Sequence, residues 1–203
     1  MKKYILDSCI NYIKKYFPQY DKDKLAEIKY GLESIYLSIS KAIVVFAIAV
    51  ILGILKEVII ILLLYNTLRA FAYGLHATKS WICLVSSLLI FIGAPLLAIN
   101  VIIPTTIKVL IICFSIIIFY LYAPADTKKH PIIKRKKRIF CKCIVIIIAC
   151  IYSFICLYTN NNFISNAILM ALIIEAIFVM PITYKMFKLP YNNYKTYLQL
   201  NNI

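Results

Sequence analysis

The chain has 203 residues, of which 63% are hydrophobic and 15% are charged, and its mean hydropathy is +0.87. Soluble domains average about 45–50% apolar and about 25% charged residues, so this composition excludes a water-soluble globule. The net charge of +15 points to an anionic partner. Nucleic acid is excluded because the basic residues flank apolar runs and match no nucleic-acid-binding module. The seven cysteines lie mostly in or beside apolar runs, which indicates reduced thiols rather than a disulfide framework.

Two amphipathic helices are predicted within residues 1–37. Apolar residues recur at helical spacing before Pro18, and again from Leu25 to Ile35. Lysines stand beside both apolar faces, which favours helices that lie on a membrane surface and turn their lysines toward anionic headgroups. A cytosolic helical hairpin packed on the rest of the chain is the alternative.

Six apolar segments follow, and they predict six transmembrane helices of roughly the ~20 residues that span a bilayer. The predicted fold class is therefore all-α: a polytopic membrane bundle over residues 38–184, preceded by the amphipathic helices and followed by a tail at 185–203. Lys56 and Glu57 are expected to form the polar turn between the first two spans. The predicted spans are Ser38–Leu55, Val58–Tyr73, Ser80–Ile99, Thr105–Ala123, Phe140–Tyr158 and Ile164–Tyr184.

The distribution of positive charge predicts the orientation of these spans. If the N-terminus is cytoplasmic, the inner faces carry most of the basic residues, including a basic loop within residues 123–139. The outer turns then carry only Lys56 and Lys108. Because cytoplasmic loops are enriched in Lys and Arg, we expect a multi-pass protein of the cell membrane with both termini in the cytoplasm.

Cysteine and histidine provide the chemistry that the sequence allows. It contains no zinc-protease, serine-elbow or phosphate-loop motif, and its two histidines are too few for a histidine-rich metal site, so no metal or cofactor is expected. A cysteine nucleophile needs only a thiol and a base. His76 and Cys83 lie at the same predicted membrane face, so they form the preferred pair of base and nucleophile. His130 with Cys141 or Cys143 is the second.

Polar residues around the first pair strengthen its assignment. Asn66 and Arg69 lie one turn apart on the second predicted span, and polar residues inside a membrane are expensive enough to suggest a function. Arg69, Lys79 and a protonated histidine would each favour a thiolate at Cys83. The alternative explanation is that Arg69 and Lys79 only follow the charge bias of cytoplasmic loops.

A bend is required between the two candidate catalytic residues. Residues seven apart in one straight helix are separated by ~10.5 Å along its axis. A base must come within about 3 Å of its partner or act through one water, so His76 and Cys83 cannot share one helix. Gly74 is the expected position of the bend in the 74–83 region, since glycine adopts conformations that other residues avoid.

Two motifs resemble the accessory gene regulator B (AgrB) family, the membrane peptidases that process quorum-sensing propeptides. Residues 69–77, RAFAYGLHA, followed by Cys83, are similar to the family signature R-x-x-x-G-G-x-H-A…C. Residues 122–132, YAPADTKKHPI, are similar to its A-P-x-D-x-x-x-x-P-I loop. The size and the six-span layout also fit. Tyr73 departs from the pattern, because the family often has a first glycine there.

The resemblance implies a cysteine endopeptidase with Cys83 as nucleophile and His76 as general base, supported by Arg69, Gly74, Pro124 and Asp126. It implies an AgrD-like propeptide substrate with an acidic C-terminal tail, cleaved through an acyl-enzyme thioester so that an autoinducing peptide can cyclise. A homodimer is compatible with it. We expect the tail to bind basic residues that also anchor the loop on anionic lipid. These residues are Lys128, Lys129, Lys134, Arg135, Lys136, Lys137 and Arg138.

Two functions without catalysis compete with this interpretation. A small transporter or peptide-export component would use Asn66, Arg69 and Glu175 to line a path, and Cys83 would then serve packing. Glu175 lies deep in the last predicted span, so it needs a partner or a proton. An interaction subunit would use the basic loop to dock an acidic protein.

Overall fold

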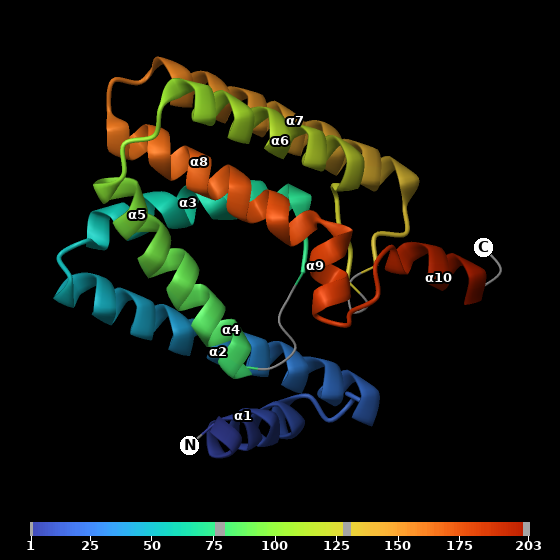
Figure 1. Ribbon diagram of the computed structural model, residues 1–203. Coiled ribbons are helices and arrows are strands. Elements are labelled where there is room, and N and C mark those ends of the chain that lie inside the picture. Colours follow the sequence, from blue (N-terminus) through green and yellow to red (C-terminus); the bar gives the residue numbers. More distant parts are fainter. Residues whose placement is uncertain (1, 76–79, 128–130, 201–203) are drawn as a thin grey trace. The chain divides into compact units, whose positions relative to one another are not determined.

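The computed structural model describes residues 2–75, 80–127 and 131–200, and the regular elements in these ranges are helices (Figure 1). Five helical stretches in them are long and apolar enough to cross a membrane, which fits a multi-pass membrane protein. The predicted count of six is not confirmed, because α3 (Leu55–Ala72) carries three charged residues, Lys56, Glu57 and Arg69. The five stretches are Lys24–Ile51, Trp81–Asn100, Thr105–Tyr122, Arg135–Tyr158 and Asn162–Val179.

The first of two compact units covers residues 1–48 and contains α1 (Lys2–Tyr16) and most of α2 (Lys22–Ile51). The ammonium group of Lys29 lies 2.8 Å from the carboxylate of Asp7 and links the two helices. Both predicted N-terminal segments are thus helical, the second as the first part of α2, while their amphipathic character is not confirmed. Their placement on a membrane surface stays a prediction.

The boundaries of α2 differ from the prediction at both ends of the first span. One helix runs through Ser38, where we expected a surface helix to give way to a separate span. The helix ends at Ile51 because Gly53 adopts a φ of +68°. The N–H of Ile54 then donates to the carbonyl of Ala49 at 2.9 Å, as in a glycine-based helix cap. Lys56 and Glu57 consequently lie in the first turn of α3 rather than in the turn before it.

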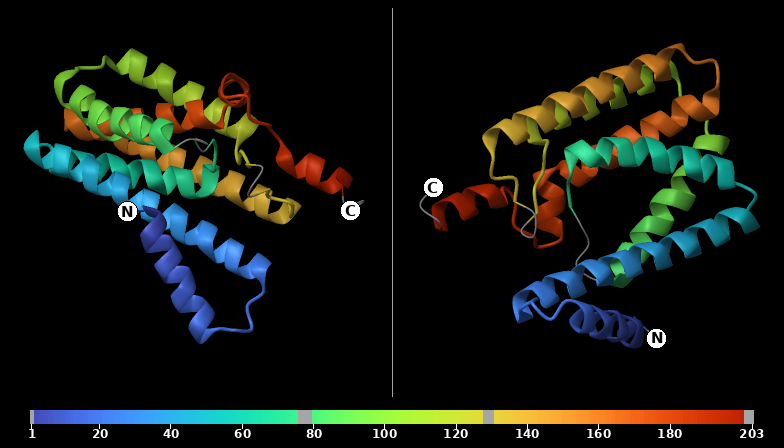
Figure 2. Two further views of the ribbon diagram at one scale, coloured as in Figure 1. Left: turned by 90° about the horizontal axis from the view of Figure 1, so that it is seen from below. Right: turned by 180° about the vertical axis from the view of Figure 1, so that it is seen from behind.

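The second unit, residues 49–203, is built around α8 (Asn162–Val179). Ala167, Ala171 and Ala176 of α8 are fully buried, and small side chains of this kind let membrane helices approach closely. Apolar side chains such as Leu110 and Phe154 on the outer helices are exposed, as expected for a surface that faces lipid. The helices around α8 are α3, α5 (Ala94–Asn100), α6 (Thr105–Tyr122) and α7 (Arg135–Tyr158) (Figures 1 and 2).

The third predicted span is confirmed as a helical run that contains a π-helical turn. It consists of α4 (Ser80–Leu88), η1 (Leu89–Gly93) and α5. The amide of Asn166, from α8, donates to the carbonyl of Ala98 at 3.0 Å and to that of Val101 at 2.6 Å. It thereby satisfies carbonyl groups that the end of α5 would leave without partners.

The last two predicted spans are shifted in the structure. α7 begins at Arg135 and not at Phe140, so part of the predicted loop 123–139 is helical, as the high helix propensity of Lys and Arg allows. α8 ends at Val179 instead of Tyr184, because Pro181 disfavours a helical conformation at the residue before it. Two short helices follow, α9 (Pro181–Met186) and α10 (Asn193–Leu200).

Candidate functional site at the junction of the two motif segments

The two motif segments meet at the end of α3. The helix stops at Ala72, and Tyr73 forms an isolated parallel β-bridge with Ala125. The N–H of Ala125 donates to the carbonyl of Ala72 at 2.9 Å, and the N–H of Gly74 donates to the carbonyl of Ala125 at 2.8 Å. Residues that lie far apart in the sequence therefore form one local structure.

The chain bends at Tyr73 and Gly74, which have φ angles of +61° and +101°. This confirms the predicted position of the bend. A Cβ atom on Gly74 would lie 2.6 Å from Nη1 of Arg69 and 3.0 Å from the carbonyl oxygen of Phe178, so glycine is required for space as well as for φ. Tyr73 holds a conformation that favours glycine, which gives a physical reason for the glycine of the family pattern at this position.

Arg69 binds a carboxylate and a backbone carbonyl beside this bend. Its Nη1 lies 3.4 Å and 3.3 Å from the two carboxylate oxygens of Glu175, and its Nη2 donates to the carbonyl oxygen of Leu75. The guanidinium carbon lies 5.3 Å from the ring centroid of Phe178. Glu175 is fully buried, and the Arg69 side chain is 14% exposed. The partner that Glu175 was expected to need is therefore Arg69.

Cys83 lies near the start of α4, and its side chain is half-buried. It is the fourth residue of α4 as the structure describes this helix. The phenol of Tyr65 interacts electrostatically with Cys83 and forms a side-chain hydrogen bond with Glu175. Tyr65 thus belongs to the polar network around Arg69. All seven cysteines, which lie in the described ranges, are outside disulfides.

Several predicted site residues lie outside the described residues. His76, Lys79, Lys128 and Lys129 belong to this group, so the pairing of His76 with Cys83 stays a prediction. The second pairing also involves such a residue, His130. Within the parts that are described, no three His, Cys, Asp or Glu side chains are grouped so that they could hold a metal ion.

Two further predicted supporting residues, Asn66 and Pro124, differ in their surroundings. Asn66 is exposed on α3, and thus does not share the buried environment of Arg69. Pro124 is half-buried next to the Ala125 bridge, and the peptide bond between Ala123 and Pro124 is cis. The functional roles of both residues stay predictions.

Asp126 connects the loop to the C-terminal helix α10. Its Oδ1 accepts the N–H of Asn193 at 3.0 Å, and its Oδ2 accepts the N–H of Tyr194 at 2.7 Å. A carboxylate that accepts the first N–H groups of a helix caps it and complements its dipole. The structure therefore gives this motif residue a role in holding α10.

Tyrosines secure the same contact. The hydroxyl of Tyr184 donates to the carbonyl oxygens of Ala125 at 3.3 Å and Asp126 at 3.2 Å. Burial raises the pKa of Tyr184, so the hydroxyl keeps its proton and remains a donor at neutral pH. The guanidinium of Arg138 lies 3.5 Å from the ring centroid of Tyr194. The predicted tail is thus folded onto the loop.

Basic residues gather at the start of α7. Arg135, Lys136 and Lys137 are exposed in its first turn, and Arg138 is half-buried. A helix N-terminus favours negative charge, so four consecutive cations are unfavourable there unless an anion is bound nearby. This violation of a local rule is typical of a functional position.

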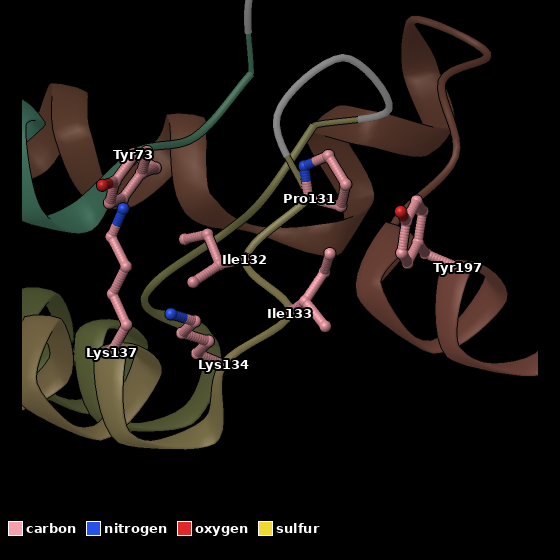
Figure 3. A pocket seen from close by; sticks show the side chains of 7 residues that line it. All are labelled: Tyr73, Pro131, Ile132, Ile133, Lys134, Lys137 and Tyr197. Atoms are coloured by element: carbon pink, nitrogen blue, oxygen red, sulfur yellow. The ribbon is translucent and has the colours of Figure 1, made fainter. Parts of the chain in front are cut away.

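A cavity of about 750 Å³ lies beside these basic residues (Figure 3). Figure 3 shows Tyr73 next to Lys137 on one side and Tyr197 of α10 on the other. Its lining combines two lysines with apolar and aromatic side chains, so it suits a peptide that carries both acidic and apolar side chains. The lining residues are Tyr73, Pro131, Ile132, Ile133, Lys134, Lys137 and Tyr197.

The sequence interpretation did not pair Arg69 with Glu175, and it did not include Asn193 or Tyr197 in the site. Arg69 and Glu175 could have been paired in advance, since each is an isolated charge in an apolar segment and the two charges are opposite. The contacts of Asn193 and Tyr197 had no comparable signal, because the C-terminal segment lacks a strong apolar pattern.

Comparisons with known proteins agree with the motifs. A sequence model described as accessory gene regulator B matches residues 6–179. A protein of Listeria monocytogenes serovar 1/2a named as AgrB-like is 33% identical over 179 residues, which cover 87% of each chain. A protein of Clostridium acetobutylicum with the same name is 32% identical and covers 84% of this chain and 82% of its own. Accessory gene regulator protein B of Staphylococcus aureus strain MW2 is 32% identical, with coverages of 81% and 87%. No solved structure matches the chain.

Proposed function

The chain belongs to the accessory gene regulator B family, and we propose that it is a cysteine endopeptidase of the cell membrane that processes a quorum-sensing propeptide. The observation that carries this proposal is the bridge between Tyr73 and Ala125. It joins the residues that precede His76 to the loop that carries the basic residues. Residues for bond cleavage and residues for substrate binding would then belong to one site.

The proposed reaction has two steps. In the first, the sulfur of Cys83 attacks the scissile carbonyl carbon and the C–N bond breaks. The amine of the tail leaves with the proton that His76 has taken from the thiol, and a thioester remains on Cys83. In the second, a thiol or hydroxyl of the substrate attacks this thioester, closes a ring and returns a proton to Cys83. Exclusion of water from the site favours ring closure over hydrolysis.

The position of Cys83 supports its role as nucleophile. Cys83 lies on α4, the helix that follows the bend at Gly74 in the sequence, and its side chain is half-buried. Backbone N–H groups near Cys83 would donate to the oxyanion that forms during attack. The base that takes the proton of this thiol would be His76.

The cavity beside α7 supports an acidic tail as the leaving segment. Lys134 and Lys137 line it, and Arg135 and Lys136 add positive charge next to it. Tyr73, which lies at the bend before His76, is part of the same wall. A tail bound there would place the bond that precedes it toward the 74–83 region. The positive charge also favours a cytoplasmic location of this face on anionic lipid.

A transporter is less well supported than a peptidase. Its path would need polar groups such as Arg69 and Glu175, but these two side chains bind each other at 3.3 Å in a buried position. They are therefore occupied by each other rather than exposed along a path.

The test of the proposed function is cleavage of an AgrD-like propeptide by the purified protein in vesicles that contain anionic lipid. We expect release of the acidic tail, detected by mass spectrometry, and no release by Cys83→Ser. Cys113→Ser serves as the matched control because Cys113 is exposed on α6, away from the site. Unchanged release by Cys83→Ser would refute the proposal.

A further inference from the structure

We propose that Glu175 is a positioning residue that acts through Arg69 to fix the backbone of Leu75. Leu75 directly precedes His76 in the sequence, so this inference deepens the proposed function and rests on it. The role of Glu175 is to hold the guanidinium of Arg69 in one orientation. Arg69 in turn holds the chain at the point where it leaves the bend.

The guanidinium group makes two different bonds at once. Nη1 faces both carboxylate oxygens of Glu175, at 3.4 Å and 3.3 Å, while Nη2 donates to the carbonyl oxygen of Leu75. A guanidinium carries its donors in a rigid planar fork, so fixing one side fixes the other. The ring of Phe178 lies 5.3 Å from the guanidinium carbon and limits its movement further.

Both peptide groups of Leu75 are tied to α8. Its N–H donates directly to the carbonyl oxygen of Phe178 at 3.2 Å, and its carbonyl is tied through Arg69 to Glu175. Gly74 leaves the space that this arrangement needs, since a Cβ atom there would lie 2.6 Å from Nη1 of Arg69. The direction of the chain after Gly74 is therefore set from one neighbouring helix.

Helix packing alone does not explain this ion pair. Burying two charges in an apolar bundle costs desolvation, and apolar side chains of similar volume would hold α3 and α8 together as well or better. Apolar side chains could not donate a hydrogen bond to Leu75. The pair is therefore best explained by the bond that its fork makes to the backbone before His76.

Two variants separate positioning from folding. Arg69→Lys keeps a positive charge opposite Glu175 but lacks the fork that reaches Leu75. The double variant Arg69→Met/Glu175→Leu removes both charges, so neither is left buried without a partner. Glu27→Gln is the matched control, because it removes the exposed ion pair with Lys24, which measures 2.8 Å.

The measurements are propeptide cleavage in anionic vesicles, with kcat and KM separated, and amide hydrogen exchange followed by mass spectrometry. We expect kcat to fall roughly tenfold to hundredfold in both variants, as for a reacting group displaced by about 1 Å, with little change in KM. Exchange should become faster at residues 73–75 and stay unchanged along α8. The control should match the wild type in every measurement.

Three results would overturn the inference. The first is a wild-type kcat in both variants. The second is a loss of cleavage with unchanged hydrogen exchange at residues 73–75, which would indicate that Arg69 contacts the substrate directly. The third is faster exchange along all of α8, which would assign the pair to packing. Continued cleavage by Cys83→Ser would instead refute the proposed function. The exchange data alone would then decide whether Glu175 and Arg69 fix residues 73–75.

Discussion

The carboxylate of Asp126 accepts a hydrogen bond of 2.7 Å from the backbone N–H of Tyr194, and this bond fastens the C-terminal helix α10 to the second motif segment. The presence of Asp126 in the second motif segment is thus explained by its structural contact with α10, without a role in proton transfer. Because Tyr197 of α10 lines the cavity, Asp126 also shapes the proposed binding surface.

Asp126→Ala should loosen α10 without unfolding the helices that surround α8. Loss of a capping side chain lowers helix stability by about 0.5–2 kcal/mol. Here the substitution removes both carboxylate oxygens that accept the N–H groups of Asn193 and Tyr194. We expect faster hydrogen exchange in residues 193–200 and a higher KM for the propeptide, because one wall of the cavity moves. Unchanged exchange in α10 would contradict the role that the hydrogen bonds give to Asp126.

Gly74→Ala should abolish cleavage. The added methyl group would meet Arg69 at 2.6 Å and Phe178 at 3.0 Å, and alanine disfavours the φ of +101°. Gly31→Ala is the control, since Gly31 lies in helix α2 with open space around its Cβ position. That control should be neutral or slightly stabilising, because alanine has the higher helix propensity by about 1 kcal/mol. Thermal unfolding and cleavage of both variants provide the comparison.

The change in thermal stability when Tyr73 is replaced should be set by the backbone conformation of the new residue rather than by loss of the aromatic ring. Tyr73→Gly and Tyr73→Ala both remove the ring, but only glycine relieves the φ of +61°. An unfavourable backbone conformation costs on the order of 1–3 kcal/mol, so the glycine variant should unfold at the higher temperature. Equal melting temperatures would show that this conformation is not strained.

Reversing charge at the cavity should weaken substrate binding in a salt-dependent manner. Lys134→Glu/Lys137→Glu is expected to raise KM at low ionic strength and to have a smaller effect as salt is added, because exposed charges are screened. Lys185→Glu is the control, since Lys185 is exposed in α9 and does not line the cavity. A rise in KM that does not depend on salt would indicate a change of structure instead.

Much of the helical architecture could be predicted from the sequence, because uniform apolar runs mark membrane helices. The runs that start at Ser80 and Thr105 predicted their helices closely. The junction near Ser38 could not be predicted, because the amphipathic pattern changes to a uniformly apolar one without a residue that ends a helix. The break before Pro181 could have been expected, since proline restricts the residue that precedes it.

The candidate site was predictable only in its parts. The sequence located the bend at Gly74 and identified Cys83, Arg69 and the basic residues as candidates. It could not show that the two motif segments are joined through Ala125, because a single backbone bridge leaves no pattern in side chains. It also suggested that Arg69 favours a thiolate, whereas the structure places its guanidinium on Glu175 and Leu75.

The most direct test of the account is to trap the covalent intermediate. The protein in anionic vesicles is mixed with a propeptide whose internal Cys or Ser is replaced by alanine, so that ring closure cannot occur, and is then digested and analysed by mass spectrometry. We predict that the Cys83 peptide carries the N-terminal part of the substrate as an adduct that hydroxylamine removes. Tail release with an unmodified Cys83, or an adduct on Cys141 or Cys143, would contradict it.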